Sequence, residues 1–239
     1  MKRVIDEELN VDYRIEASKS DSAEPYDRFW SRCVGAGRAH EGLRANWQEH
    51  LAMAVEHCGF QFVRFHGLFH DDMCVYREDE AGQPIYNWQY VHDLFDRMLD
   101  KGVRPFVELG FCPAEIAGTP STCFWWKGHG TPPGDYDKWA GLVDSFVCGC
   151  IDRYGSDEVR QWYFEVWNEP NLGFFFDGTK SEYFKLYRVS VDAIKAIDPA
   201  LRVGGPATSN FVPDDRFDGE KEDRSEEHTS ELQSLLISS

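Results

Sequence analysis

The chain has 239 residues and a formal net charge of −17, with 42 acidic against 25 basic side chains. Nucleic acids and anionic membranes bind clusters of Lys and Arg, so this balance argues against both as partners. The hydrophobic content of 42% is enough for a sizeable core, and the 15% of aromatic residues suits either core packing or contact with carbohydrate.

Cysteine usage and the N-terminus bear on metal binding and compartment. The seven cysteines form no Cys-x-x-Cys pair and have no His at ligand spacing, which predicts reduced, buried thiols and no metal site. The first eight residues include basic side chains but no apolar signal-peptide core, and no later apolar run reaches the length of a membrane span. We therefore expect a cytoplasmic protein with neither a signal peptide nor a transmembrane segment.

In chain order, a polar arm over residues 1–30 precedes an alternation of strands and helices. Asn87, Asp135 and the Thr179/Glu182 pair carry the side chains of helix N-caps. A 23-residue loop over residues 111–133 is long for a compact domain, and such loops are usually functional. The predicted strands are 31–35, 60–65, 105–110, 162–167 and 201–206, the predicted helices are about 46–58, 87–102, 135–155 and 179–198, and a hairpin is expected over 74–86.

This alternation predicts an α/β fold with a parallel sheet, either open or closed into a barrel. The chain has no G-x-G-x-x-G or phosphate-binding loop to favour the open sheet. A complete (β/α)₈ TIM barrel typically needs about 250 residues, and this chain uses most of its length on about five strands. We therefore expect residues 31–223 to form a truncated (β/α)₈ TIM barrel.

The candidate catalytic motif is Asn168-Glu169-Pro170, which follows an aromatic and β-branched strand. The carboxyl ends of parallel strands carry the chemistry of barrel enzymes, so Glu169 is a candidate general acid. The Asn168 amide beside it can bind a sugar hydroxyl through its donor or its acceptor. The alternative is a strand that ends in a plain Asn-Glu-Pro turn, which leaves the surrounding aromatic residues unexplained.

At this point the sequence resembles glycoside hydrolase family 39, and within that family the bacterial β-xylosidases more than the α-L-iduronidases. The resemblance implies a (β/α)₈ barrel, retaining hydrolysis of terminal β-D-xylosyl residues and no cofactor. It covers roughly residues 28–210 through the motifs CVGAGR (33–38), RFHG (64–67), YRED (76–79), RPFVE (104–108), FEVWNEPNL (164–172) and VGGPA (203–207).

The same resemblance implies roles for individual residues. Glu169 matches the catalytic acid/base, Asn168 the residue that contacts the sugar 2-hydroxyl, and His66 a residue that lines the substrate pocket. A structural His66, hydrogen-bonded under a loop, remains the alternative. Trp125 and Trp126 resemble substrate-binding residues of the pocket wall, with core packing equally open.

Hydrolysis with retention needs a second carboxylate about 5 to 5.5 Å from the acid. Glu165 lies four residues before Glu169 on one strand, roughly 13 Å away at about 3.3 Å per residue, which excludes it. For Glu108 we expect a hydrogen-bonding role inside the barrel. The resemblance assigns the nucleophile to a seventh strand, which is absent from this chain, so we expect the fragment itself to be inactive.

Two other functions stay open. One is an α-L-iduronidase-like glycosidase, which needs a basic group for the substrate carboxylate. The other is a non-catalytic, carbohydrate-binding half-barrel. The expected partner is a xylo-oligosaccharide or related glycoside, and oligomerisation stays open.

Residues 224–239 are predicted to be an artificial tail. Residues 224–234 match an in-frame translation of a common sequencing-library adapter at all eleven codons. A natural acidic disordered segment would share this composition but not this order.

Deleting residues 224–239 is expected to leave the midpoint of thermal unfolding unchanged. The segment is rich in Ser and mixed charge, and only residues 235–237 could bury apolar surface. The measurement is a thermal melt of both chains, and a fall of several degrees would show that the tail packs on the fold.

Overall fold

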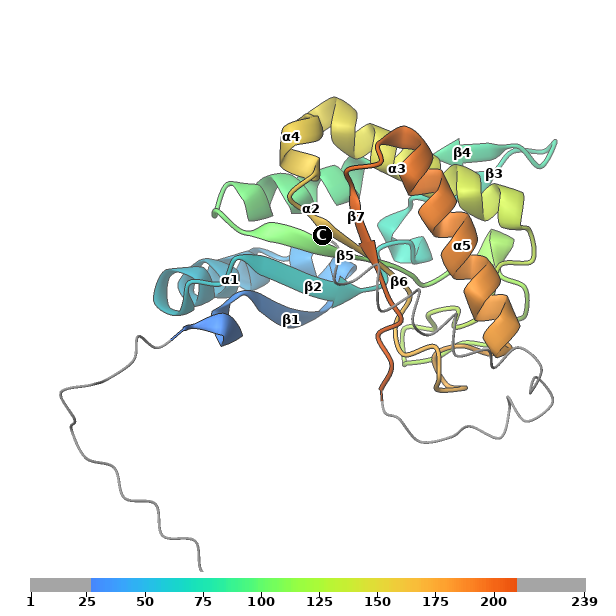
Figure 1. Cartoon of the computed structure of the whole chain (residues 1–239), viewed down its shortest axis with the longest axis horizontal. Helices are drawn as coiled ribbons and strands as arrows, with labels where there is room; N and C mark the ends of the chain where they lie inside the picture. Colours follow the sequence, from blue (N-terminus) through green and yellow to red (C-terminus); the bar gives the residue numbers. More distant parts are fainter. Residues whose placement is uncertain (1–26, 210–239) are drawn as a thin grey trace, which may run out of the picture.

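The structure, a computed structural model, describes residues 27–209 (Figure 1). Most of the predicted N-terminal arm and all of the predicted tail lie outside these described residues. Within them, no helix is both long and apolar enough to cross a bilayer.

Five parallel strands form the central sheet, in the same order as in the sequence. This confirms the α/β prediction, and each new strand pairs with the preceding strand of the sheet. The strands are β1 (Cys33–Arg38), β2 (Phe62–His66), β5 (Arg104–Leu109), β6 (Tyr163–Val166) and β7 (Arg202–Gly204).

The helices gather along one side of the fanned strands (Figure 1). In the chain, the predicted hairpin follows β2 and precedes α2. It is an antiparallel pair of β3 (Tyr76–Glu78) and β4 (Pro84–Tyr86). The α-helices are α1 (Ala45–Cys58), α2 (Gln89–Leu99), α3 (Tyr136–Tyr154), α4 (Ser156–Val159) and α5 (Lys180–Ile197), and short 3₁₀ turns cover Phe29–Ser31, Ala39–Leu43, Asp71–Met73 and Ala114–Ile116.

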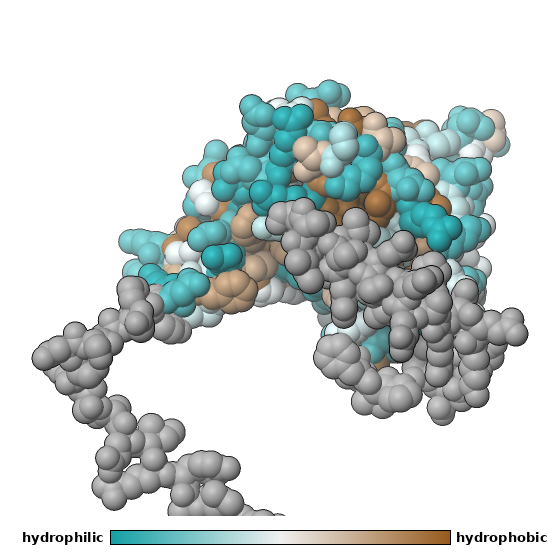
Figure 2. All heavy atoms as spheres, in the orientation of Figure 1, coloured by the Kyte–Doolittle hydropathy of each residue, from teal (hydrophilic) through white to brown (hydrophobic). Residues whose placement is uncertain are grey.

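The two faces of the sheet differ in chemistry. One face carries apolar side chains and supplies fully buried core residues such as Val63, Val107 and Val166. The other face is only partly covered and starts with an aromatic layer, in which the ring of Tyr163 packs against Phe62 and Phe106 at 5.2 and 5.4 Å. In Figure 2 the helical rim is largely hydrophilic and hydrophobic residues gather near the middle of the view.

Several details differ from the sequence predictions. The first strand begins at Cys33 rather than at residue 31, because Ser31 ends a 3₁₀ turn and its hydroxyl donates to the carbonyl of Arg28. The short helix α4 was not predicted. The thiols were expected to be buried, but Cys33 and Cys74 are exposed. In α5, the polar residue Ser190 is fully buried, and the indole N–H of Trp139 donates to its hydroxyl at 2.9 Å.

Two of the three predicted helix caps are present, whereas the N-cap of α2 is Trp88 rather than the predicted Asn87. The Asp135 carboxylate accepts from the backbone N–H of Asp137 and Lys138 at the start of α3. Thr179 and Glu182 form the expected capping box, and Asn87 Oδ1 accepts from the N–H of Gln89. These side chains satisfy backbone donors that have no partner within the first helical turn.

Replacing Asp135 with Ala is expected to lower the free energy of unfolding by about 1 kcal/mol, because two N–H groups lose their acceptor. Urea unfolding measures the change. Asp144→Ala, on the exposed side of the same helix, is the matched control and should change stability by less than about 0.5 kcal/mol. Equal effects of the two substitutions would contradict the capping role.

Candidate active site

The segment after β6 turns sharply and carries the candidate acid. Trp167 and Glu169 have positive φ angles of 70° and 43°, which are uncommon for residues other than glycine. The backbone N–H of Glu169 donates to the carbonyl of Ala207, just after β7, at 2.9 Å. Glu169 is thereby attached to two neighbouring strands, and its side chain remains partly exposed.

Packing around Trp167 holds this turn. Its ring is fully buried and packs edge-on against Phe111 and Phe176 at 5.4 and 5.5 Å. Its indole N–H donates to the carbonyl of Phe175 at 2.9 Å. A positive φ at a bulky residue costs on the order of 1–3 kcal/mol, and these contacts offset that strain.

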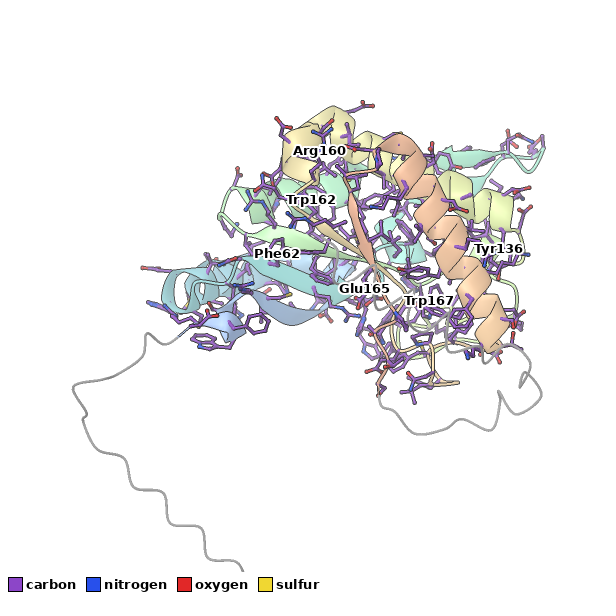
Figure 3. The ribbon with its side chains drawn as sticks, viewed as in Figure 1. Phe62, Tyr136, Arg160, Trp162, Glu165 and Trp167 are labelled. Atoms are coloured by element: carbon purple, nitrogen blue, oxygen red, sulfur yellow. The ribbon has the colours of Figure 1, made fainter. Side chains whose placement is uncertain are left out.

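Arg64, in β2, is the centre of a polar cluster on the open face of the sheet. Its Nε donates to Glu165 Oε2 at 2.5 Å, and its terminal nitrogen lies 3.1 Å from Glu108 Oε2. The same terminal nitrogen donates to Asn168 Oδ1 at 2.9 Å. Figure 3 shows Glu165 near the middle of the sheet, between Phe62 and Trp167 in that view.

The bond from Arg64 determines how the Asn168 amide is oriented. A guanidinium carries only donors, so the atom that it contacts on Asn168 must be the carbonyl oxygen. The two N–H donors of the buried Asn168 amide are therefore the ones left for a ligand. Donors of this kind bind the oxygen atoms of sugar hydroxyls.

Burial and charge act against each other in the cluster. Burial raises the pKa of Glu165, and Glu108 adds to this effect, whereas Arg64 partly offsets it. Burial of Arg64 works to lower its pKa, but the carboxylates of Glu108 and Glu165 outweigh it and raise the pKa. Arg64 therefore stays charged, and the cluster depends on that charge.

His66 joins the cluster through Glu108. Its Nδ1 lies 2.6 Å from Glu108 Oε2, and the Glu108 side chain is fully buried. The chain of contacts His66–Glu108–Arg64–Asn168 therefore connects β2, β5 and the segment after β6. Of the residues named from the sequence, His66, Asn168 and Glu169 lie in this connected region.

Phe124 links His66 to the loops. Its ring stacks on His66 at 6.0 Å and contacts Phe174 and Phe175 at 5.6 and 5.4 Å. The loop over residues 111–133 thus meets the segment that follows Glu169. Gly130 allows the close approach, since a Cβ there would lie 2.9 Å from the carbonyl oxygen of Phe175.

The two tryptophans named from the sequence have different surroundings. Trp126 is half-buried and stacks on Phe124 at 5.1 Å. Trp125 is 77% exposed. The guanidinium of Arg38, which pairs with Asp72, lies 5.1 Å from each indole ring. Trp126 therefore packs against the aromatic rings of its own loop, whereas the ring of Trp125 faces solvent.

A cavity of about 480 Å³ lies along β7 and α5, but it is not the site predicted from the sequence. Its lining includes Glu165, Tyr163 and Arg202, and does not include Glu169, Asn168 or His66. Among residues 27–209, no three His, Cys, Asp or Glu side chains come together in a way that could hold a metal ion.

Arg64, Glu165 and Phe124 belong to this site although no role at it was predicted for them from the sequence. The signal for the first two was present, because both carry a charge in the middle of an otherwise apolar strand. Strand register brings them together: Arg64 aligns with Phe106, and Glu108 aligns with Glu165. No sequence pattern marked Phe124.

Comparison with known proteins adds to this geometry. The model of glycosyl hydrolases family 39 matches residues 13–218. The chain belongs to this family. It is 46% identical over 192 residues to a β-xylosidase of Geobacillus stearothermophilus, an alignment that covers 79% of this chain and 38% of that protein. Human α-L-iduronidase is more distant, at 30% identity over 203 residues, with 79% and 29% covered.

A solved structure of the family agrees with the fold. The family 39 enzyme from Xanthomonas axonopodis pv. citri is 45% identical, with a TM-score of 0.75 over 78% of this chain and 37% of that chain. The five-stranded sheet therefore corresponds to part of a family 39 barrel. The chain spans about two fifths of the length of the β-xylosidases that it matches.

Replacing Arg64 with Ala is expected to lower the free energy of unfolding by about 3–5 kcal/mol at neutral pH, because Glu108 and Glu165 remain buried without their cation. The pKa of Glu165, already raised by burial, rises further in the variant. The ionised form is then the costly one in the fold, so the loss should shrink as the pH falls towards that pKa.

Urea unfolding between pH 5 and pH 8 measures both effects. Arg97→Ala is the matched control, since Arg97 pairs with Asp93 on the exposed surface of α2 and should contribute about 0.3–0.5 kcal/mol. A loss for Arg64→Ala that is as small as the control, or that grows as the pH falls, would contradict the buried cluster.

Proposed function

We propose that this chain carries the acid/base side of a retaining β-xylosidase, which removes terminal β-D-xylosyl residues. Glu169 is the general acid/base in this proposal, and Asn168 binds the sugar hydroxyl next to the bond that is cleaved. The observation that carries the proposal is the contact from Arg64 to Asn168 Oδ1, which leaves amide donors available beside a partly exposed carboxylate.

The two nearby carboxylates suit support rather than attack on the substrate. Glu165 bonds to Arg64, and Glu108 is fully buried against His66 and Arg64. The described residues contain five strands of the sheet, and we propose that the nucleophile comes from the seventh strand of the parent enzyme. By the parent enzyme we mean this sequence extended to the full length of its β-xylosidase relatives.

A xylosyl substrate is favoured over an iduronyl one. Iduronic acid carries a carboxylate, which needs a basic partner in the protein, whereas xylose has no carboxylate. The two arginines near the site are already neutralised, Arg64 by Glu108 and Glu165, and Arg38 by Asp72. The higher identity to β-xylosidases than to α-L-iduronidase agrees with this choice.

In the proposed reaction, Glu169 donates its proton to the glycosidic oxygen as the nucleophile attacks the anomeric carbon. The bond to the leaving group breaks, and a covalent xylosyl-enzyme forms. Glu169, now a carboxylate, takes a proton from water as the water attacks the same carbon. This step releases xylose and restores both carboxyl groups.

In the parent enzyme, Glu169→Gln is expected to slow the cleavage of xylobiose by about 10²–10⁴-fold, because the poor leaving group needs protonation. An aryl β-xyloside with an activated leaving group should lose much less in its glycosylation step. Single-turnover kinetics on both substrates measure the difference.

Glu56→Gln, on the exposed face of α1, is the control and should leave both rates unchanged. Equal losses on the two substrates would remove Glu169 from the acid role. A parent enzyme that binds xylobiose and hydrolyses neither substrate would favour the carbohydrate-binding alternative, and faster cleavage of an aryl α-L-iduronide would favour the iduronidase-like one.

A further inference from the structure

Glu108 is a buried carboxylate that the proposed reaction does not use. Its side chain is fully buried in the middle of the sheet, between β2 and β6. Oε2 contacts His66 Nδ1 at 2.6 Å and the terminal nitrogen of Arg64 at 3.1 Å, whereas Oε1 is buried and has no hydrogen-bond partner among residues 27–209. A buried oxygen without a partner costs free energy of folding, so we expect a function for the contacts that the other oxygen makes.

We propose that Glu108 is a positioning residue that fixes the ring orientation and the tautomer of His66, so that His66 Nε2 accepts a hydrogen bond from a substrate hydroxyl. This inference rests on the proposed function, because it gives His66 a substrate contact. It adds a physical reason why a carboxylate lies on the far side of the histidine from the substrate.

The ion pair between Glu108 and Arg64 decides where the proton in the contact with His66 lies. The terminal nitrogen of Arg64 lies 3.1 Å from Oε2, in the geometry of a cation paired with a carboxylate. An ionised carboxylate only accepts hydrogen bonds, so the proton in the 2.6 Å contact must reside on His66 Nδ1. A neutral imidazole with its proton on Nδ1 has a lone pair on Nε2, which makes Nε2 an acceptor.

The ring of His66 is also restrained by its neighbours. Phe124 stacks on it at 6.0 Å, and Phe111 lies 6.2 Å away at a tilt. About a quarter of the His66 side chain is exposed. Phe111 and Phe124 also contact each other at 6.2 Å, so the two rings form one aromatic wall beside His66. With Nδ1 bound to the buried carboxylate, Nε2 is the nitrogen left for a ligand.

The pair of variants Glu108→Gln and Glu108→Met separates positioning from general support of the fold. Gln retains an oxygen that can accept from His66 Nδ1, and the donors of Arg64 also favour that oxygen at the Oε2 position. Met has a similar length and no comparable acceptor. Both variants remove the charge next to Arg64, so a purely structural role predicts similar effects of the two.

The tautomer is measured by NMR on ¹⁵N-histidine-labelled protein, in the 239-residue chain and in the parent enzyme, with His66→Gln to assign the signal. We expect the proton on Nδ1 in the wild type and in Glu108→Gln, and a mixture of tautomers or the Nε2 form in Glu108→Met. Glu158→Met is the matched control, since it breaks the partly buried pair with Arg104 at the other end of β5 and should not alter His66.

Kinetics of the parent enzyme on an aryl β-xyloside supply the second measurement. Glu108→Met should raise KM roughly tenfold with a smaller change in kcat, since about 1.4 kcal/mol of hydrogen bonding to the substrate is lost. Glu108→Gln should lie closer to the wild type.

An Nε2 proton on His66 in the wild type would overturn the proposal, as would an unchanged tautomer in Glu108→Met. The NMR result does not depend on hydrolysis, so it distinguishes a failure of this inference from a failure of the acid/base assignment. If Glu169 is not the acid but the tautomers behave as expected, the proposed function fails and the positioning of His66 remains.

Discussion

The pairing of Arg64 with two carboxylates is the interaction on which the candidate site depends. A partly buried guanidinium is tolerated because Glu165 and Glu108 both contact it, and two buried carboxylates are tolerated because both pair with this cation. The same cation accounts for the orientation of the Asn168 amide. Three strands, β2, β5 and β6, therefore share one electrostatic arrangement, and a change in any of its members alters the surroundings of the others.

The two faces of the sheet have different roles, since one carries the hydrophobic core and the other carries the candidate site. Its helix-covered face contains only apolar side chains such as Val63 and Phe164, and packing there supplies the core. The open face has an aromatic layer around Tyr163 and, nearer the carboxyl ends of the strands, the polar cluster. Alternation along each strand produces both faces at once, because successive side chains point to opposite sides.

Sequence reasoning went furthest where the determinants are local. The caps at Asp135 and Thr179 act within one helical turn, so the starts of α3 and α5 were predictable, and the parallel order of the sheet follows from the alternation of elements. The Asn168-Glu169 pair was recognisable from its place after a strand. The roles given to Glu169, Asn168, His66, Trp125 and Trp126 remain predictions.

What the sequence could not supply is the set of contacts between distant residues. Arg64 and Glu165 are separated by 101 positions, and only the register of two strand pairings brings them into contact. Phe124 contacts His66 because two loops meet, and loop conformation depends on the packing of both. Ser190 is a buried polar residue in α5, and its hydrogen-bond donor, the indole of Trp139, lies on another helix.

The order of the strands has a consequence for how the site is completed during synthesis. Each strand of the sheet pairs with the one made before it, so the sheet can grow at a single edge as the chain leaves the ribosome. Arg64 emerges 101 residues ahead of Glu165, which at about 5–20 residues per second is a delay of about 5–20 s. During that interval the guanidinium lacks one of its two carboxylates and is best left in water. The pairing of Arg64 is therefore complete only after β6 has docked, so the charge network of the site forms late in the assembly of the sheet.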